Sequence, residues 1–375
     1  MSARESAVEG QGGGPSASAP KIPTGRALLL VAVLTLLTIS GLYVLLPALA
    51  GAEKTWNRLD EGDPILLVLA AGLEVVSFCS YVFAFRGVFG TGSIRINLRD
   101  SYRITMAGLA ATRLLATAGA GGVALTLWAL VRMGMPRAQI VSREAIFLVL
   151  FYAVFMGTLV VGGVGLYVGI FPGEAPFALT IVPAIFGAIV IVLALLAARF
   201  SAGIQRAAKR VKAAERRISK VGRAMQTLPA ALATGVRGAI AMVRARKIEV
   251  LGAIGWWGFD IAVLLVCLHA FGGSPPVAVV VMAYFVGMIA NALPVPGGVG
   301  AVDGGMIGAL IGFGVDSGLA IVGVLSYRFF AFWLPIIPGV IAYVQLLRTE
   351  PANRSSRSSS TPVYAQGKPG GQSGG

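Results

Sequence analysis

The sequence has few charged residues for its length. Asp, Glu, Lys and Arg make up 13% of the 375 residues, whereas 56% are hydrophobic. A soluble domain carries about a quarter of its residues as charges, so this composition excludes an ordinary soluble domain. It indicates instead a membrane protein that crosses the bilayer several times.

Histidine and cysteine are also scarce, which argues against several kinds of site. The one histidine, His269, and the two cysteines, Cys79 and Cys267, lie in or at the end of apolar stretches, without metal-ligand spacing. We therefore expect no metal site and no cofactor, and we interpret these side chains as structural. Because there is also no Ser–His pair, HExxH motif or carboxylate-rich metal motif, we predict that the chain is not an enzyme.

Long apolar runs are present in place of charge. A helix needs about 20 apolar residues to cross the hydrocarbon core of a bilayer. Two apolar regions, about 104–131 and 277–313, are broken by Gly and Pro and predict re-entrant helical hairpins. The predicted fold is an all-α polytopic membrane protein with these two hairpins and about six full spans. The spans are predicted near residues 27–49, 64–86, 145–170, 177–198, 250–271 and 318–347.

The two ends of the chain differ in composition from the rest. Residues 1–25 are rich in Gly, Ser, Ala and Pro, and residues 349–375 in Ser, Gly and Arg. Neither segment can bury a core, so we predict two disordered tails. Residues 26–348 are predicted to form one membrane domain. Its parts are a first half at about 64–170, a second half at about 250–347, and a basic cytoplasmic loop at 199–249.

The distribution of Lys and Arg predicts the orientation in the membrane. The loop 199–249 carries thirteen Lys and Arg against two Glu, and it supplies most of the net charge of +15. Every basic loop falls on one side if both termini are cytoplasmic, which predicts a multi-pass cell-membrane protein. No aromatic interleaving or DNA-reading motif accompanies the charge, so we expect anionic lipid headgroups, not nucleic acid, as the partner of this loop.

The two broken regions resemble each other. One runs GLAATRLLATAGAGGVALTLWAL from Gly108, and the other runs GMIANALPVPGGVGAVDGGMIGAL from Gly287. Each has small residues, a Gly-rich bend and an apolar leg, and the spans before them align Glu74 with Asp260. On the predicted orientation the two segments enter from opposite sides. This predicts an inverted repeat, a plan that recurs in secondary transporters with a substrate site near the midplane.

The second bend, NALPVPGGVGAVDGG from Asn291, concentrates helix breakers at membrane depth. Irregular backbone is tolerated there only where it is buried in protein or lines a polar cavity. We expect a new half-helix near Val302, whose N-terminus favours an anionic group. The alternative interpretation is a kink used only for close helix packing. The residues expected to end one half-helix and turn the backbone are Pro294, Pro296, Gly297, Gly298 and Gly300.

Ionisable side chains also lie inside the apolar segments. Each costs about 2.5–3.5 kcal/mol on insertion scales, which makes it a candidate functional residue. We expect Asp303 to pair with Arg328, and Arg113 to pair with Glu74 or Glu144; ion pairs that only fix helix packing are the alternative. Their distribution over both halves predicts a polar cavity. The predicted substrate-binding residues are Glu74, Arg113, Asp260, Asn291, Pro294, Pro296, Gly297, Gly298, Gly300, Asp303 and Arg328.

The second half resembles the signature region of the lysylphosphatidylglycerol synthase transmembrane-region family, also called flippase-like. Members show Pro-x-Pro-Gly-Gly-x-Gly, an acidic residue, a Gly about ten residues later and an Arg in the last span. The resemblance covers about 27–347, with two departures. Asp303 stands where Glu is usual, and the first Gly-rich segment lacks the usual Pro. The matching positions are Pro294, Pro296, Gly297, Gly298, Gly300, Asp303, Gly314 and Arg328.

The resemblance implies a lipid transporter or flippase. An anionic headgroup, like that of phosphatidylglycerol or a polyprenyl phosphate, would enter the polar cavity, with Arg113 and Arg328 binding phosphate. The alternative is a membrane accessory subunit that presents lipid to a separate glycosyl- or aminoacyltransferase. The soluble aminoacyltransferase domain of the multiple peptide resistance factor is absent from this sequence, so we expect no synthesis of lysyl-lipids.

Overall fold

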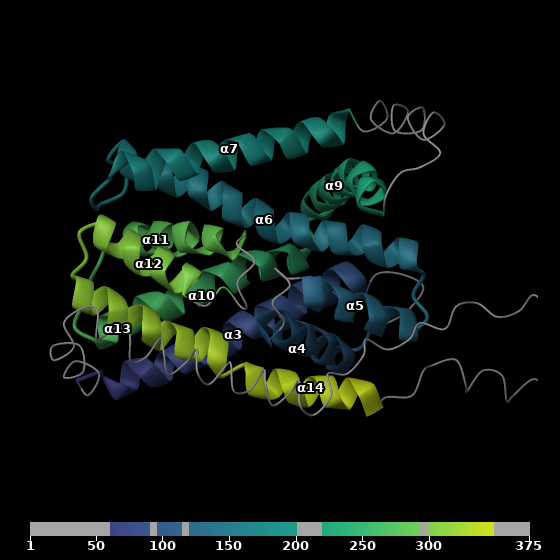
Figure 1. Cartoon of the computed structure of the whole chain (residues 1–375), viewed down its shortest axis with the longest axis horizontal. Coiled ribbons are helices and arrows are strands. Elements are labelled where there is room, and N and C mark those ends of the chain that lie inside the picture. The colour runs from purple at the N-terminus through teal and green to yellow at the C-terminus, as the bar shows by residue number, and fades with distance from the viewer. Residues whose placement is uncertain are drawn as a thin grey trace, which may run out of the picture.

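The structure, a computed structural model, describes residues 61–90, 96–114, 120–200, 220–292, 298 and 300–348. All regular elements of these ranges are helical (Figure 1), which confirms the predicted all-α class. The predicted first span and both predicted tails lie outside the described residues. The helices are α3 Pro64–Phe89, α4 Leu98–Leu114, α5 Ala120–Arg132, α6 Arg137–Tyr167, α7 Phe177–Arg199, α9 Lys220–Arg244, η1 Ile248–Val250, α10 Leu251–Ala270, α11 Val277–Ile289, η2 Ala290–Ala292, α12 Ala301–Gly312, α13 Ser317–Arg328, η4 Phe329–Trp333 and α14 Ile336–Arg348.

Five helical stretches of the described residues are long and apolar enough to cross a membrane. They are α3, α6, α7, η1 with α10, and the continuous stretch from α13 to α14. Each matches a predicted span, although α6 begins at Arg137, earlier than expected. The outward faces are apolar: on α7, for example, Ile185, Ile189 and Val192 are exposed. Such surfaces are stable against lipid, so the chain is a membrane protein with several spans.

Two pairs of short helices, α4 with α5 and α11 with α12, correspond to the two broken regions. Helices α5, α11 and α12 have 13, 13 and 12 residues. At 1.5 Å per residue each reaches about 20 Å or less, which is shorter than a hydrocarbon core of about 30 Å. Figure 1 shows α4 and α5 at the end of the molecule where α6 begins, and α11 and α12 at the opposite end. Entry of the pairs into a membrane from opposite sides remains a prediction.

A glycine allows the helices of each pair to approach closely. A Cβ atom on Gly122 would lie 2.7 Å from the Gly108 carbonyl oxygen, and one on Gly287 would lie 2.7 Å from the Met306 backbone nitrogen. Small residues permit such contacts between helices in membranes. Gly108 and Gly287 are also the first residues of the two matched sequence segments. The repeated sequence pattern therefore corresponds to the same kind of helix contact in both pairs.

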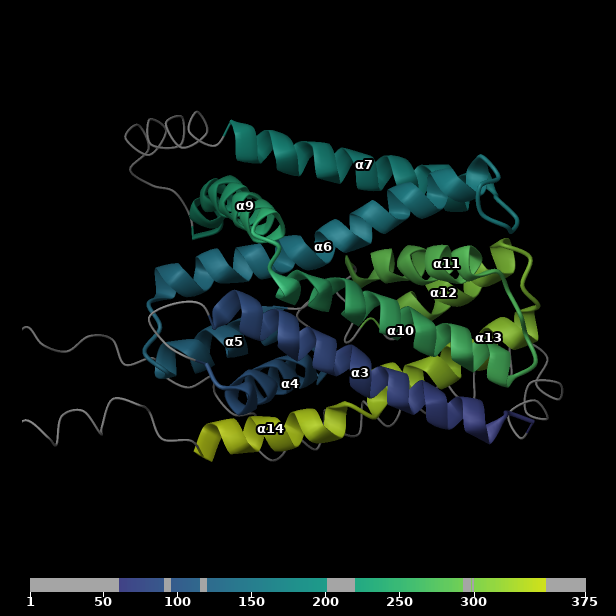
Figure 2. The same ribbon diagram turned by 180° about the vertical axis from the view of Figure 1, so that it is seen from behind.

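Helices α3 and α10 lie side by side along the middle of the molecule (Figure 2). Gly252 permits this contact, because a Cβ atom there would lie 2.6 Å from the Ser80 carbonyl oxygen. The Ser77 hydroxyl donates a hydrogen bond of 3.0 Å to the Trp256 carbonyl oxygen. Since α3 belongs to the first predicted half and α10 to the second, this contact joins the two halves.

The basic segment 199–249 contains a helix that packs against the rest of the protein. Helix α9 lies against α6 and α7. A Cβ atom on Gly235 would lie 2.6 Å from the Ala145 carbonyl oxygen, so α9 and α6 are in close contact. The predicted loop is therefore helical over Lys220–Arg244 and attached to the first half.

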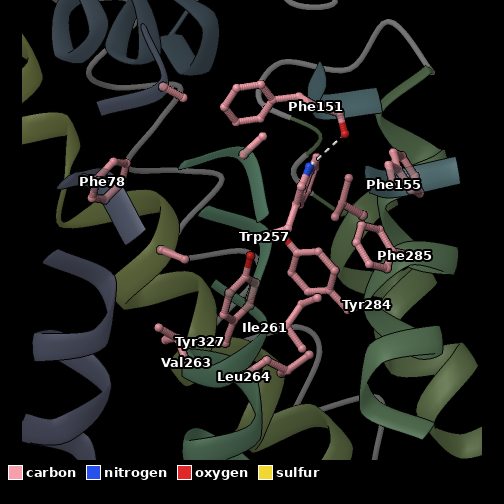
Figure 3. Packing of buried hydrophobic residues seen from close by; sticks show 14 of the residues in the cluster. Phe78, Phe151, Phe155, Trp257, Ile261, Val263, Leu264, Tyr284, Phe285 and Tyr327 are labelled. Atoms are coloured by element: carbon pink, nitrogen blue, oxygen red, sulfur yellow. Dashed lines mark hydrogen bonds between the residues drawn. The ribbon is translucent and has the colours of Figure 1, made fainter. Parts of the chain in front are cut away.

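An aromatic core connects α6, α10, α11 and α13 (Figure 3). The Trp257 indole N–H donates a hydrogen bond of 3.0 Å to the Phe151 carbonyl oxygen. Trp257 and Tyr284 have ring centroids 6.0 Å apart, and Tyr284 and Tyr327 have centroids 5.9 Å apart. The tyrosine hydroxyls of this core bring polar atoms to the inner side of α10.

Candidate functional site: a polar cavity between the halves

A cavity of about 670 Å³ lies between helices of both halves. It is large enough for a phospholipid headgroup, because ligand pockets typically measure about 300–1,000 Å³. Its walls come from α3, α4, α5 and α6 of the first half, from α7, and from α10, α11, η2, α13 and η4 of the second half. The polar residues that line it are Glu74, Thr105, Thr112, Arg113, Thr126, Glu144, Asp260, Asn291, Tyr327 and Arg328.

Glu74 and Asp260 form a pair of carboxyl groups on one wall of the cavity. They are 3% and 5% exposed, and the charge of each carboxyl group acts on the other. The Asp260 Oδ2 atom also accepts hydrogen bonds from the Tyr284 hydroxyl and, at 2.9 Å, from the Tyr327 hydroxyl. The two residues aligned by the sequence repeat thus meet at the α3–α10 contact.

Arg113, near the end of α4, binds the backbone of the last span. Its Nη2 and Nη1 atoms donate to the carbonyl oxygens of Ala331 at 2.7 Å and Phe332 at 3.1 Å. A proline four residues further on removes the normal helical donor to the Ala331 carbonyl, because Pro335 has no N–H. Arg113 replaces that donor and so binds these carbonyl oxygens directly. The expected pairing with Glu74 is present only as a nearby charge.

Arg328 and Asp303 form the ion pair expected from the sequence. The Arg328 Nε atom contacts the Asp303 Oδ1 atom, and the residues are 6% and 0% exposed. The other carboxylate oxygen of Asp303 accepts the Gly300 backbone N–H at 2.8 Å. Helix α12 begins at Ala301, so Asp303 also neutralises the partial positive charge of that helix N-terminus. The half-helix expected near Val302 is confirmed.

The two arginines approach each other across one aromatic ring. The guanidinium carbon of Arg113 lies 5.4 Å from the Phe332 ring centroid, and that of Arg328 lies 4.6 Å from the same centroid. Both distances fit cation–π contacts. Two positive groups from opposite halves therefore contact the same ring at the cavity wall.

The structure brings most of the predicted site residues together. Asp303 is buried and pairs with Arg328. Gly300 is exposed at the start of α12, with φ of 81°. Gly298 lies near the Asn291 side chain, with φ of 67°. Pro294, Pro296 and Gly297 lie outside the described residues. The predicted residues that line the cavity are Glu74, Arg113, Asp260, Asn291, Gly298 and Arg328.

Sequence reasoning missed the aromatic residues of the site. Tyr284 and Tyr327 are fully buried and bind Asp260, and the Phe332 ring contacts both arginines. Aromatic side chains in apolar spans are common, so they carry no signal alone. A signal did exist for two of them. In the sequence SYRFFAF, Tyr327 directly precedes Arg328 and Phe332 follows it four residues later.

The cavity opens toward the apolar surface on one side. Four of its lining residues, Val123, Leu148, Tyr152 and Phe186, are between 39% and 54% exposed. They belong to α5, α6 and α7, whose outer faces are apolar. The opening is therefore lined by side chains that suit contact with lipid acyl chains.

The fold and the buried charges define the class: a helical membrane protein with a polar cavity among its spans. The sequence profile described as lysylphosphatidylglycerol synthase TM region matches residues 25–339. The chain belongs to this family. It is also similar to a UPF0104 membrane protein of Methanothermobacter thermautotrophicus strain Delta H, with 29% identity over 103 residues. That match covers 26% of this chain and 29% of the relative, so it supports the family and not a particular activity.

Proposed function

We propose that the chain is a lipid transporter that moves an anionic phospholipid between the leaflets of the cell membrane. The observation that carries this proposal is the pair of arginines, half-buried Arg113 and buried Arg328, that contact one ring in the cavity. Guanidinium groups bind phosphate through several hydrogen bonds at once, and they do so more strongly in a site that excludes water. A phosphodiester headgroup fits this chemistry.

The open side of the cavity supports a lipid as the substrate. The headgroup would occupy the polar cavity, while the acyl chains would leave between α5 and α6, past Val123, Leu148 and Tyr152. This arrangement keeps the charged group away from hydrocarbon and leaves the tails in the bilayer. Transfer of an unpaired charge into hydrocarbon is the main barrier to lipid crossing, and the cavity would lower that barrier.

The two pairs of short helices support alternating access. If α4–α5 enters from the cytoplasmic side and α11–α12 from the outer side, their inner ends meet at the cavity from opposite leaflets. The conformational change would then separate one pair from its surroundings while the other stays packed, as in transporters with inverted repeats. The basic segment around α9 would lie at the cytoplasmic surface with both termini.

Reconstitution of the full chain in vesicles tests this function. A tail-labelled phosphatidylglycerol is quenched from outside by a membrane-impermeant reductant, and the fraction that remains protected reports crossing. Arg113→Met should slow crossing by about tenfold to a hundredfold, because one charge-assisted contact is worth about 1.5–3 kcal/mol. Arg199→Met, at the exposed end of α7, is the matched control and should leave the rate unchanged.

Two results would contradict the proposal. One is a wild-type rate no higher than that of protein-free vesicles. The other is an unchanged rate in Arg113→Met with the variant shown to be folded by size-exclusion chromatography. Co-purification with a transferase, together with no crossing by the isolated chain, would favour the accessory-subunit alternative.

A further inference from the structure

We propose that Glu74 is a proton-binding site and that its protonation is linked to binding of the anion in the cavity; the identity of the anion rests on the proposed function. Two buried carboxyl groups that lie close together do not both ionise readily, because like charges repel strongly at low dielectric. Glu74 and Asp260 are 3% and 5% exposed, line the same cavity and interact as charges. The pair thus holds one proton inside the membrane domain.

The surrounding donors assign this proton to Glu74. Asp260 accepts from the hydroxyls of Tyr284 and Tyr327, so two donors stabilise its ionised form. The Glu74 Oε2 atom is buried and has no hydrogen-bond partner among the described residues. Glu74 therefore has fewer hydrogen-bond donors than Asp260 to stabilise a negative charge, and it lines the cavity.

Charge balance links this proton to the anion. With every ionisable group charged, the cavity cluster contains Glu74, Glu144, Asp260 and Asp303 as four negative charges, against Arg113 and Arg328 as two positive charges. The sum is −2, and protonation of Glu74 brings it to −1. An anion enters a less negative site more readily, especially at low dielectric. Binding of the anion and of the proton therefore favour each other by the same factor.

The groups that face Glu74 come from several elements. The charges of Asp260 on α10 and Arg113 on α4 interact electrostatically with the Glu74 carboxyl group. The Glu74 charge also interacts with Cys267 of α10 and with Tyr327 of α13. Helix α6 contributes Glu144 to the same cavity, and α11 contributes Tyr284 through Asp260. The remaining members of the buried polar cluster are Tyr81, Asp303 and Arg328.

The linkage supplies a source of energy for transport. A phosphodiester carries one negative charge, so its movement with one proton is electrically neutral. A pH difference across the membrane would then drive the lipid toward the side with the lower proton concentration. Direction would follow the proton gradient, whereas the membrane potential would have no direct effect on the neutral pair.

Binding to the detergent-solubilised full chain tests the linkage. The probes are short-chain phosphatidylglycerol and dimethyl phosphate, which both stay monoanionic between pH 5 and 9, with short-chain phosphatidylcholine as the zwitterionic control. For the wild type, we expect the Kd to rise about tenfold per pH unit above the midpoint of Glu74 titration. Glu74→Gln imitates the protonated state and should bind at all pH values with the Kd that the wild type has at low pH. Glu174→Gln, in an exposed loop, should keep the wild-type pH dependence.

A flat Kd between pH 5 and 9 for the wild type, or the same slope in Glu74→Gln as in the wild type, would overturn the linkage. A slope with both probes shows that the phosphodiester is sufficient, and a slope with the lipid alone shows that the tails contribute; either supports the linkage. Crossing of phosphatidylglycerol without a pH slope in Kd would leave the proposed function intact and remove this inference. A pH slope in Kd without crossing would support the linkage and contradict the proposed function.

Discussion

At the scale of single residues, Asp303 has two partners that explain its burial. It accepts the Gly300 N–H at the start of α12 and it pairs with Arg328. A carboxylate that is 0% exposed needs such partners, because a lone buried charge is strongly destabilising. Asp303 therefore positions Arg328 and the helix, whereas Arg328 itself reaches the cavity.

This pairing predicts the effect of removing one charge. Asp303→Asn keeps an oxygen for the Gly300 N–H but leaves the Arg328 cation without its counterion, so the free energy of unfolding should fall by about 3–5 kcal/mol. The double variant Asp303→Asn/Arg328→Met should recover most of that loss, because no lone charge remains. Thermal unfolding in detergent measures both. A double variant that is as unstable as the single one would show that Asp303 does not act through Arg328.

At the scale of helices, the close contacts within the α11–α12 pair predict which glycines are required. A Cβ atom on Gly287 would lie 2.3 Å from the Met306 side chain and 2.7 Å from its backbone nitrogen. Gly287→Ala should therefore lower the free energy of unfolding by about 1–3 kcal/mol, as overpacking does. Gly304→Ala is the matched control, since a Cβ atom there meets nothing within 4 Å. Equal melting temperatures for the two variants would contradict this packing.

The sequence predicted the start of α12 and the Asp303–Arg328 pair because their signals are local. Glycines at a helix start and charges within one apolar region can be read from neighbouring residues. It did not predict the partners of Arg113, which are carbonyl oxygens more than 200 residues away. The Ala331 carbonyl lacks its helical donor because Pro335 has no N–H. Arg113 reaches these oxygens because α4 packs against α14, and that contact exists only in the folded chain.

At the scale of the whole molecule, the orientation can be tested by chemical labelling. Cys79 and Cys267 are first replaced by Ala. In that background, Ala138→Cys lies at the α5–α6 end and Ser274→Cys in the α10–α11 connection, and both positions are exposed. A membrane-impermeant maleimide added outside intact cells should label only Ser274→Cys. Labelling of Ala138→Cys from outside would invert the predicted orientation.

The predicted inverted repeat accounts for the sequence match of Glu74 with Asp260. Equivalent positions of two related halves can meet where the halves face each other, and α3 and α10 form that contact. The cavity beside it was predicted only in outline. Its size and open side depend on aromatic side chains from α6 and α7, which lie outside the two matched segments.

The π-helical turn Phe329–Trp333 sets the rotation of the last helix. The Leu334 N–H donates to the carbonyl oxygen of Phe329, five residues earlier, so the turn contains one residue more than an α-helical turn. Deleting one residue there would restore ordinary winding and rotate α14 about its axis by about 100°. Gly339 would then leave its place against Ala110 of α4. The extra residue thus rotates the C-terminal helix so that Gly339 packs against α4 while the carbonyl oxygens of the turn face Arg113.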